Sequence, residues 1–351
     1  MKTIFLSDIH IGTDALTNLY KSETDQTNLK LILNYIQNNS SQIKDVVILG
    51  DWIDLWMFPS STLPPTPQQI IDANPKVFNI QTDGSGDFIS CMDSIQGNLF
   101  YVNGNHDMTV TEKDINDHFA PASKKSKHVH CINCSKRQKS YLSGLVYGEH
   151  GHWNSMVCSP YKNESLSFGY YMTRAGMQNI ENTKKDLPPL NVLAVQELIS
   201  YNELTFAQAM LTFQANQLGL NSMEDLVFMM PDGSTITANA VADKFKDLSI
   251  NDAEFLRVDV GGSLNVSAVQ HLSRSKHKIL VLGHTHIKEL YTANNKIYAN
   301  SGFLCANTPD SNGVPVSTFV EIENNDDKYA VSMIKIDYAT GAFSVDKTIS
   351  L

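Results

Sequence analysis

The sequence predicts an α/β protein, and three observations lead to this fold class. A strand-like segment, a helical segment and a second strand-like segment follow one another within the first 50 residues, as in a βαβ unit with parallel strands. The second strand contains four successive apolar residues, 46–49, as expected where a sheet is covered on both faces. It leads into Gly50 and Asp51, and other strand-like segments also end in Asp, Asn or His. Ligands of open α/β folds bind at the carboxyl ends of strands, so these polar residues define the candidate site.

The first elements follow from apolar runs and helical spacing. Strands are predicted over residues 3–6 and 45–49. Between them, apolar residues at helical spacing predict an amphipathic helix over about 25–38. Residues 59–75 contain five prolines and predict a loop that leaves the Asp51 end of the second strand.

The segment up to residue 153 predicts one helix and two further strands. The helix is expected over 88–95, and the strands over 99–102 and 141–147. Residues 123–139 between these strands are basic and predict a solvated loop.

Residues 154–275 differ in character, because helical spacing replaces the strand-like runs. Successive helices are predicted near 193–199, 206–213, 241–248 and 264–272, with a turn at 231–233 and no strand comparable to those around it. We therefore divide the chain into residues 1–153 as the first part of the core, 154–275 as a helical insertion or cap, and 276–351 as the second part of the core.

The chain after the insertion predicts strands again. They are expected over 278–282, 296–299, 317–322 and 329–336. The turn at 338–341 closes a C-terminal hairpin. The last strands are expected to form antiparallel edges of a second sheet.

Composition indicates a globular protein and argues against one class of partner. The chain is 42% hydrophobic and 18% charged, with a net charge of −10. An acidic balance disfavours nucleic acid as a partner, because nucleic-acid binding needs rows of Lys and Arg. The sequence shows neither a segment typical of a signal peptide nor an apolar run long enough to span a membrane, and its five cysteines fit reduced thiols. We expect a cytoplasmic location.

Seven polar residues at the strand ends form the candidate metal site. They are Asp8, His10, Asp51, Asn105, His150, His284 and His286. Taken singly, each is typical of a turn, a helix cap or a solvated loop. A single catalytic zinc needs only about three protein ligands, so this set indicates two metal ions with one bridging carboxylate. Imidazole mixed with carboxylate and amide oxygen suits Mn, Fe, Zn, Co or Ni better than Ca or Mg.

The motifs that hold these residues resemble a known family. They are Asp8-x-His10, Gly50-Asp51-x-x-Asp54, Gly104-Asn105-His106-Asp107, Gly148-x-His150-Gly151-His152 and Gly283-His284-Thr285-His286. In this order they resemble the five sequence blocks of the calcineurin-like metallophosphoesterases. The resemblance implies a sandwich of two mixed β-sheets flanked by helices, with a dinuclear metal site at the strand ends. Only the large helical insertion and the C-terminal tail lie outside this pattern.

The resemblance also implies a role for each residue. The first metal would be held by Asp8, His10, Asp51 and His286, and the second by Asp51, Asn105, His150 and His284. His106 matches the family's catalytic histidine, and Asp54 matches the carboxylate that orients it. His152 is a further candidate that would reach the first metal or the substrate.

The implied reaction is hydrolysis of a phosphoester. Two divalent cations, with Mn²⁺ the expected ion in vitro, lower the pKa of a bridging water, and the metal-bridging hydroxide attacks phosphorus. His106 protonates the leaving oxygen or stabilises the developing charge. The expected activity is that of a phosphodiesterase or phosphomonoesterase acting on a small or medium substrate.

Three alternatives stay open. The layout is similar to that of UDP-diacylglucosamine pyrophosphohydrolases, which act on a UDP-sugar-lipid. Those enzymes share an arginine directly after the asparagine of the third motif, whereas this chain has His106 there. A nuclease would need a basic channel, which the net charge of −10 disfavours. A non-catalytic metal-binding scaffold is disfavoured by the complete ligand set.

The insertion and its neighbourhood suggest further hypotheses. The insertion would be a lid over the substrate or an oligomerisation surface, and its position between metal-ligand motifs favours the lid. Arg174 or Arg274 would clamp a phosphate, with a surface arginine as the plainer interpretation. Trp52, Trp56 and Phe58 would pack the proline-rich loop onto the core, or one of them would line a substrate pocket.

Overall fold

The computed structural model describes residues 1–78, 87–119, 129–132, 140–162, 164–185, 204–248, 264–304, 317–326, 328–338 and 340–351. Their strands form two mixed sheets of seven and five strands and a separate two-stranded sheet. The predicted α/β sandwich of two mixed sheets flanked by helices is therefore confirmed.

The seven-stranded sheet has the order β14-β13-β12-β1-β2-β3-β4. Its strands are β1 (Lys2–Leu6), β2 (Ile43–Leu49), β3 (Leu99–Val102), β4 (Val129–Ile132), β12 (Ser317–Asn325), β13 (Lys328–Asp337) and β14 (Ala342–Ser350). The strands β1 to β4 are parallel, whereas β12 pairs antiparallel with β1 and begins an antiparallel meander. The expectation that the C-terminal strands belong to a second sheet is therefore wrong, because they extend the sheet that begins with β1.

The five-stranded sheet has the order β10-β11-β9-β6-β5. Its strands are β5 (Tyr141–Ser143), β6 (Val146–Gly148), β9 (Ile279–Leu282), β10 (Lys288–Ala293) and β11 (Lys296–Ser301). The strand expected over 141–147 is in fact a hairpin, whose turn contains Gly144 at φ 57°. The strands β6 and β9 are parallel neighbours, so the insertion leaves and re-enters the core between adjacent strands.

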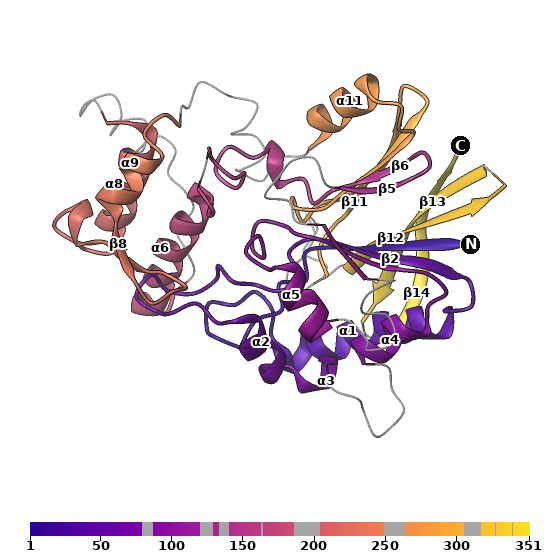
Figure 1. Cartoon of the computed structure of the whole chain (residues 1–351), viewed down its shortest axis with the longest axis horizontal. Coiled ribbons are helices and arrows are strands. Elements are labelled where there is room, and N and C mark those ends of the chain that lie inside the picture. Colours follow the sequence, from indigo (N-terminus) through magenta and orange to yellow (C-terminus); the bar gives the residue numbers. More distant parts are fainter. Residues whose placement is uncertain are drawn as a thin grey trace.

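Apolar side chains fill the space between the two sheets. Phe5, Val47 and Val102 of the first sheet join Val146 and Val281 of the second in one buried cluster. The helices α1 (Ser22–Asn38) and α4 (Phe88–Ser94) contribute to a second cluster with the other face of the first sheet. Helix α11 (Asn265–Arg274) covers the outer face of the second sheet, so the helices enclose the sandwich from both sides (Figure 1).

Part of the proline-rich segment forms helices. The loop expected over 59–75 contains α2 (Pro67–Ala73), and α3 (Pro75–Phe78) follows it. Thr66 and Gln69 form a reciprocal capping box, and Pro67 occupies the first turn. Proline suits that position because its missing N–H would have no partner in the helix. The prediction of a loop is therefore wrong for residues 67–73.

The basic segment over 123–139 also contains regular structure. Strand β4 pairs in parallel with β3, which corrects the prediction of a solvated loop for residues 129–132. His130 on this strand is exposed and stacks on Phe100, with ring centroids 4.8 Å apart. The rest of this segment lies outside the described residues. After β3 come the short helices α5 (Glu112–Asp114) and η1 (Ile115–Phe119), the latter a π-helix.

The insertion is mostly helical in its described part. Its elements are η2 (His152–Asn154), α6 (Phe168–Thr183), α8 (Phe206–Gln217), η3 (Met223–Asp225), α9 (Ala238–Lys244) and α11, with the hairpin β7 (Val227–Met229) and β8 (Thr235–Thr237). The hairpin corrects the expectation that the insertion holds no strand, and the turn expected at 231–233 is confirmed as its tip. The helix predicted near 193–199 falls outside the described residues. Helices α6, α8 and α9 gather at the end of the molecule opposite the two termini (Figure 1).

None of the helices in the described ranges combines the length and apolarity that a membrane crossing requires.

Candidate metal centre

The candidate ligands come from the ends of five strands in both large sheets. Asp8 and His10 follow β1, Asp51 follows β2, Asn105 follows β3, His150 follows β6, and His284 and His286 follow β9. Five of these residues have a left-handed backbone, with φ between 52° and 72°: Asp8, His10, Asp51, His284 and His286. This conformation is unfavourable for residues other than glycine and collects at functional sites. The chain thus turns sharply after β1, β2 and β9 and directs these side chains to one place.

Close glycines make this convergence sterically feasible. A Cβ atom on Gly104 would overlap Oδ1 of Asp51, and one on Gly50 would overlap the backbone of Gly104. The loops after β2 and β3 therefore approach each other more closely than side chains would permit. Gly50 additionally has φ of 83°, which favours glycine in its own right.

The first group of ligands surrounds His10. Its Nε2 lies 3.1 Å from Nε2 of His286 and 3.7 Å from Oδ2 of Asp51. Nε2 of His286 lies 3.4 Å from Oδ1 of Asp8. Asp8, His10 and His286 each offer one ligand atom, and these atoms lie within 4.8 Å of one another.

The second group surrounds His150. Its Nε2 lies 3.2 Å from Oδ2 of Asp51 and 3.1 Å from Oδ1 of Asn105. Asp51, His150 and His284 likewise offer three ligand atoms within 4.8 Å of one another. Asp51 Oδ2 therefore lies near imidazoles of both groups, which is the arrangement that a bridging carboxylate requires.

The donor set fits divalent transition-metal ions. Nδ1 of His150 donates to the carbonyl of Leu49 at 2.6 Å, and Nδ1 of His10 donates to Oδ2 of Asp54 at 3.1 Å. These bonds fix both rings and leave each Nε2 facing the carboxylates, as in histidine ligands whose second nitrogen is held by an oxygen acceptor. Buried oxygen and imidazole donors at this spacing match the preferences of Mn, Fe, Co, Ni and Zn. The residues present could therefore hold metal ions.

His106 lies beside both groups and is held by Asp54. Its Nδ1 donates to Oδ1 of Asp54 at 3.0 Å, because the ionised carboxylate can only accept. Its backbone N–H donates to Oδ1 of Asp51 at 2.8 Å. The ring of His10 meets the ring of His106 edge to face, with centroids 4.5 Å apart. The candidate catalytic histidine is thus bonded to the candidate ligand Asp51 through its backbone, and its ring contacts the candidate ligand His10.

Charges within the site shift the pKa values of its groups. Burial alone would raise the pKa of Asp51, but the imidazoles of His150 and His106 hold it well below the ordinary value. Burial lowers the pKa of His106, and the carboxylates of Asp54 and Asp51 outweigh this and raise it to about 9. Burial and the charge on His150 lower the pKa of His284 to about 3. Added divalent charge would lower the pKa of each imidazole and favour its neutral, ligating form.

His152 lies next to the second group without belonging to it. Its ring centroid is 5.4 Å from that of His150 and 6.4 Å from that of His284. The side chain is fully buried, and neither ring nitrogen has a hydrogen-bond partner among the described residues. A buried imidazole without a partner is costly, so a ligand or bound water at this position would stabilise it.

Sequence reasoning missed the role of Asp107, the last residue of the third motif. Its carboxylate accepts hydrogen bonds from the backbone N–H groups of Trp52 at 3.1 Å and Gly104 at 2.6 Å, and from the hydroxyl of Tyr101 at 2.5 Å. Asp107 therefore fastens the loops after β2 and β3 together. Its place in the Gly-Asn-His-Asp motif is the signal that could have identified it.

The hypothesis that Arg174 clamps a phosphate is wrong, and so is the plainer interpretation of a surface arginine. Arg174 is fully buried in α6. Its guanidinium donates to the backbone carbonyls of Phe58 at 3.3 Å and Pro59 at 2.8 Å, and also to those of Ser60, Thr62 and Met229. Arg274 is exposed on α11, where it lines a cavity of about 400 Å³ against the outer face of the second sheet.

Comparisons with known proteins identify the family. The model of the calcineurin-like phosphoesterase family matches residues 1–223, which include the first four motifs but not Gly283–His286. No curated protein sequence matches the chain.

Solved structures with some likeness include a Vps29 single mutant from Entamoeba histolytica, with 10% identity, a TM-score of 0.34, and 100% of this chain and 99% of that chain covered. An archaeal phosphodiesterase has 9% identity, a TM-score of 0.34, and both chains fully covered. A predicted phosphoesterase from Streptococcus pneumoniae has 10% identity and a TM-score of 0.31, and the alignment covers 100% of this chain and 97% of that chain. The family model spans well over half of the sequence, and on that match the chain belongs to the calcineurin-like phosphoesterase family.

Proposed function

We propose that the protein is a metal-dependent phosphoester hydrolase acting on a small or medium phosphomonoester or phosphodiester. The observation that supports this most directly is the position of Asp51. One carboxylate oxygen faces His10 and His150, and the other accepts the backbone N–H of His106. A candidate bridging ligand and a candidate proton donor thereby lie next to each other, which supports hydrolysis by two metal ions.

Two metal ions would divide the ligands between them. Asp8, His10, Asp51 and His286 would hold one ion, and Asp51, Asn105, His150 and His284 would hold the other. When bound, the cations would supply a nucleophile at neutral pH and neutralise the charge on the phosphate oxygens. Manganese is the ion we propose for in vitro work, since the donor set suits it.

His106 would act as the proton donor. Because Nδ1 is occupied by Asp54 at 3.0 Å, Nε2 is the nitrogen available to face the leaving oxygen. As the bond between phosphorus and this oxygen breaks, Nε2 gives its proton to the oxygen. Asp54 keeps the ring oriented and balances its charge.

We further propose that residues 154–275 form a cap on the core rather than an independent domain. A Cβ atom on Gly169 of α6 would lie 3.2 Å from the ring of Trp56, which stacks on His106. Near the other end of the insertion, a Cβ atom on Gly151 would lie 2.7 Å from Leu264. These contacts support a cap that touches the catalytic region at two places.

Turnover of simple esters would test the proposed function. Protein loaded with Mn²⁺ should hydrolyse 4-nitrophenyl phosphate, bis(4-nitrophenyl) phosphate or both, and the preferred ester would assign the substrate class. Asp51→Asn should lose this turnover together with bound metal, as measured by elemental analysis. If protein with two bound metal ions hydrolyses neither ester, the proposed hydrolysis of simple phosphoesters is contradicted.

A further inference from the structure

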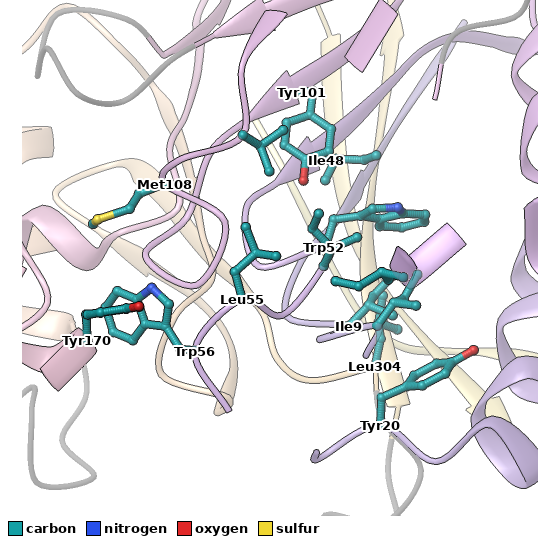
Figure 2. Close-up of a cluster of buried hydrophobic side chains, with 14 of the residues drawn as sticks. Ile9, Tyr20, Ile48, Trp52, Leu55, Trp56, Tyr101, Met108, Tyr170 and Leu304 are labelled. Carbon is teal, nitrogen blue, oxygen red and sulfur yellow. The ribbon is translucent and has the colours of Figure 1, made fainter. Parts of the chain in front are cut away.

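Trp56 lies between the insertion and the candidate catalytic histidine. Its indole ring stacks on the ring of His106, with centroids 4.6 Å apart and planes at 24°. Tyr170 of α6 meets the same indole edge to face at 6.0 Å, and the two side chains overlap in the view of Figure 2. Trp56 is only 1% exposed, so its ring is buried where it contacts the histidine and the helix.

The backbone around Trp56 is tied to His106 as well. The N–H of Trp56 donates to Oδ1 of Asp54 at 2.9 Å, and the same oxygen accepts Nδ1–H of His106. The N–H of Leu55 donates to the carbonyl of His106 at 3.2 Å. A displacement of Trp56 would therefore move both supports of the histidine ring, namely the stacked indole and the carboxylate.

Helix α6 fixes the other end of this loop. Arg174 donates to the carbonyls of Phe58 and Pro59, which lie two and three residues beyond Trp56. Gln178, one turn further along α6, accepts the N–H of Ser61 at 3.0 Å. Gly169 allows the helix backbone to approach the indole, since any Cβ there would crowd the ring and the carbonyl of Val157. The loop is thus fastened to the insertion shortly beyond the residue that touches His106.

We infer that Trp56 is a positioning residue for His106, and that helix α6 of the insertion holds Trp56 against the histidine ring. This inference rests on the proposed function, in which His106 protonates the leaving oxygen. The stack fixes the plane of the ring while Asp54 fixes Nδ1, so Nε2 keeps one direction. The insertion then supports proton transfer directly, in addition to any role in covering the substrate.

Leaving-group dependence would test the role in proton transfer. A 4-nitrophenolate leaves readily without a proton, whereas a phenolate needs one, so a misplaced proton donor should affect the phenyl ester more. In the full chain loaded with Mn²⁺, Trp56→Leu should lower kcat for the phenyl ester about tenfold more than for the 4-nitrophenyl ester. Trp56→Phe keeps a flat ring on His106 and should restore most of the loss. An equal loss on both esters would overturn the inference.

Phe245→Leu provides a matched control. Phe245 is buried within the insertion and packs on Tyr161, Phe168 and Tyr171 rather than on Trp56. This variant should lower the melting temperature without changing the ratio of the two kcat values. If it changes the ratio as Trp56→Leu does, general loosening of the insertion explains the effect and the inference fails.

Nuclear magnetic resonance of the full chain loaded with diamagnetic Zn²⁺ gives a readout that needs no turnover and avoids the line broadening that Mn²⁺ would cause. The stacked indole should shift the ring-proton resonances of His106 upfield, and Trp56→Leu should remove that shift while Phe245→Leu retains it. If the wild type hydrolyses neither ester, only the proposed function is contradicted. The comparison of His106 resonances between the wild type and the variants would still test whether Trp56 positions the histidine ring. His106 resonances that do not move in Trp56→Leu would overturn the inference.

Discussion

Oδ1 of Asp54 lies 3.0 Å from Nδ1 of His106, and Oδ2 of the same carboxylate lies 3.1 Å from Nδ1 of His10. One buried side chain therefore orients both the candidate proton donor and a candidate metal ligand. Oδ1 also accepts the backbone N–H groups of Trp56 and Met57 at 2.9 Å each. The second Asp of the Gly-Asp-x-x-Asp motif thus links the candidate catalytic histidine, the candidate metal centre and the loop that contacts helix α6 of the insertion.

Asp54→Asn should lower kcat by about 10- to 100-fold, because the amide retains the shape but not the negative charge that holds both imidazoles. The measurement is kcat together with metal content by elemental analysis. Asp45→Asn is a suitable control, since Asp45 is a buried carboxylate earlier on strand β2 that accepts the backbone N–H of Asn98. Wild-type kcat and metal content in Asp54→Asn would contradict this prediction.

Binding of Mn²⁺ should raise the melting temperature of the protein. A ligand that binds only the folded state at about 100 times its Kd stabilises by about 2.7 kcal/mol per site. His150→Ala should lose most of this shift in a thermal scan with and without Mn²⁺, while His130→Ala should retain it because His130 is exposed on β4. Equal shifts in the two variants would show that His150 does not contribute to metal binding.

The candidate site could be located from the sequence because its candidate ligands have local signals. Asp8, Asp51 and His150 follow short apolar strands, and glycines stand within the motifs of Asp51 and His150. Parallel strands in one sheet bring their carboxyl ends together, so the local signals imply spatial proximity. The left-handed backbone at Asp51 and His284 has no such signal, because it results from the packing of loops from different strands.

Contacts between distant segments could not be predicted in the same way. The alternating strand β12 would suit the edge of either sheet, and only its pairing with β1 settles its place. From the sequence, Arg174 is expected on the surface or at a phosphate. Its actual partners, the carbonyls of Phe58 and Pro59, lie far away in the chain, and no local pattern indicates them. The helix α2 is a different case, since the spacing of Thr66 and Gln69 is a local capping signal within the segment predicted as a loop.

Gly104→Ala should destabilise the protein by about 1–3 kcal/mol, because the added methyl group would overlap the carboxylate of Asp51. The displaced carboxylate should also reduce the bound metal. Gly233→Ala is the matched control: it has φ of 82° at the tip of the β7–β8 hairpin, and a methyl group there would meet no atom of the described residues within 4 Å. The control should lose about 1 kcal/mol through backbone strain alone and keep its metal. Urea unfolding and elemental analysis would separate the two effects, and full metal content in Gly104→Ala would refute the steric argument.

Arg174→Met should destabilise the protein by about 3 kcal/mol or more. The shorter, uncharged side chain fills part of the space but donates no hydrogen bonds, which leaves the carbonyls of Phe58 and Pro59 buried without these donors. Segment 58–62 should then become accessible to limited proteolysis in native conditions, because its attachment to α6 is lost. Arg274→Met removes an exposed arginine from α11 and should stay within about 0.5 kcal/mol of the wild type. Equal stability of the two variants in thermal scans would mean that the buried guanidinium does not hold the insertion to the core.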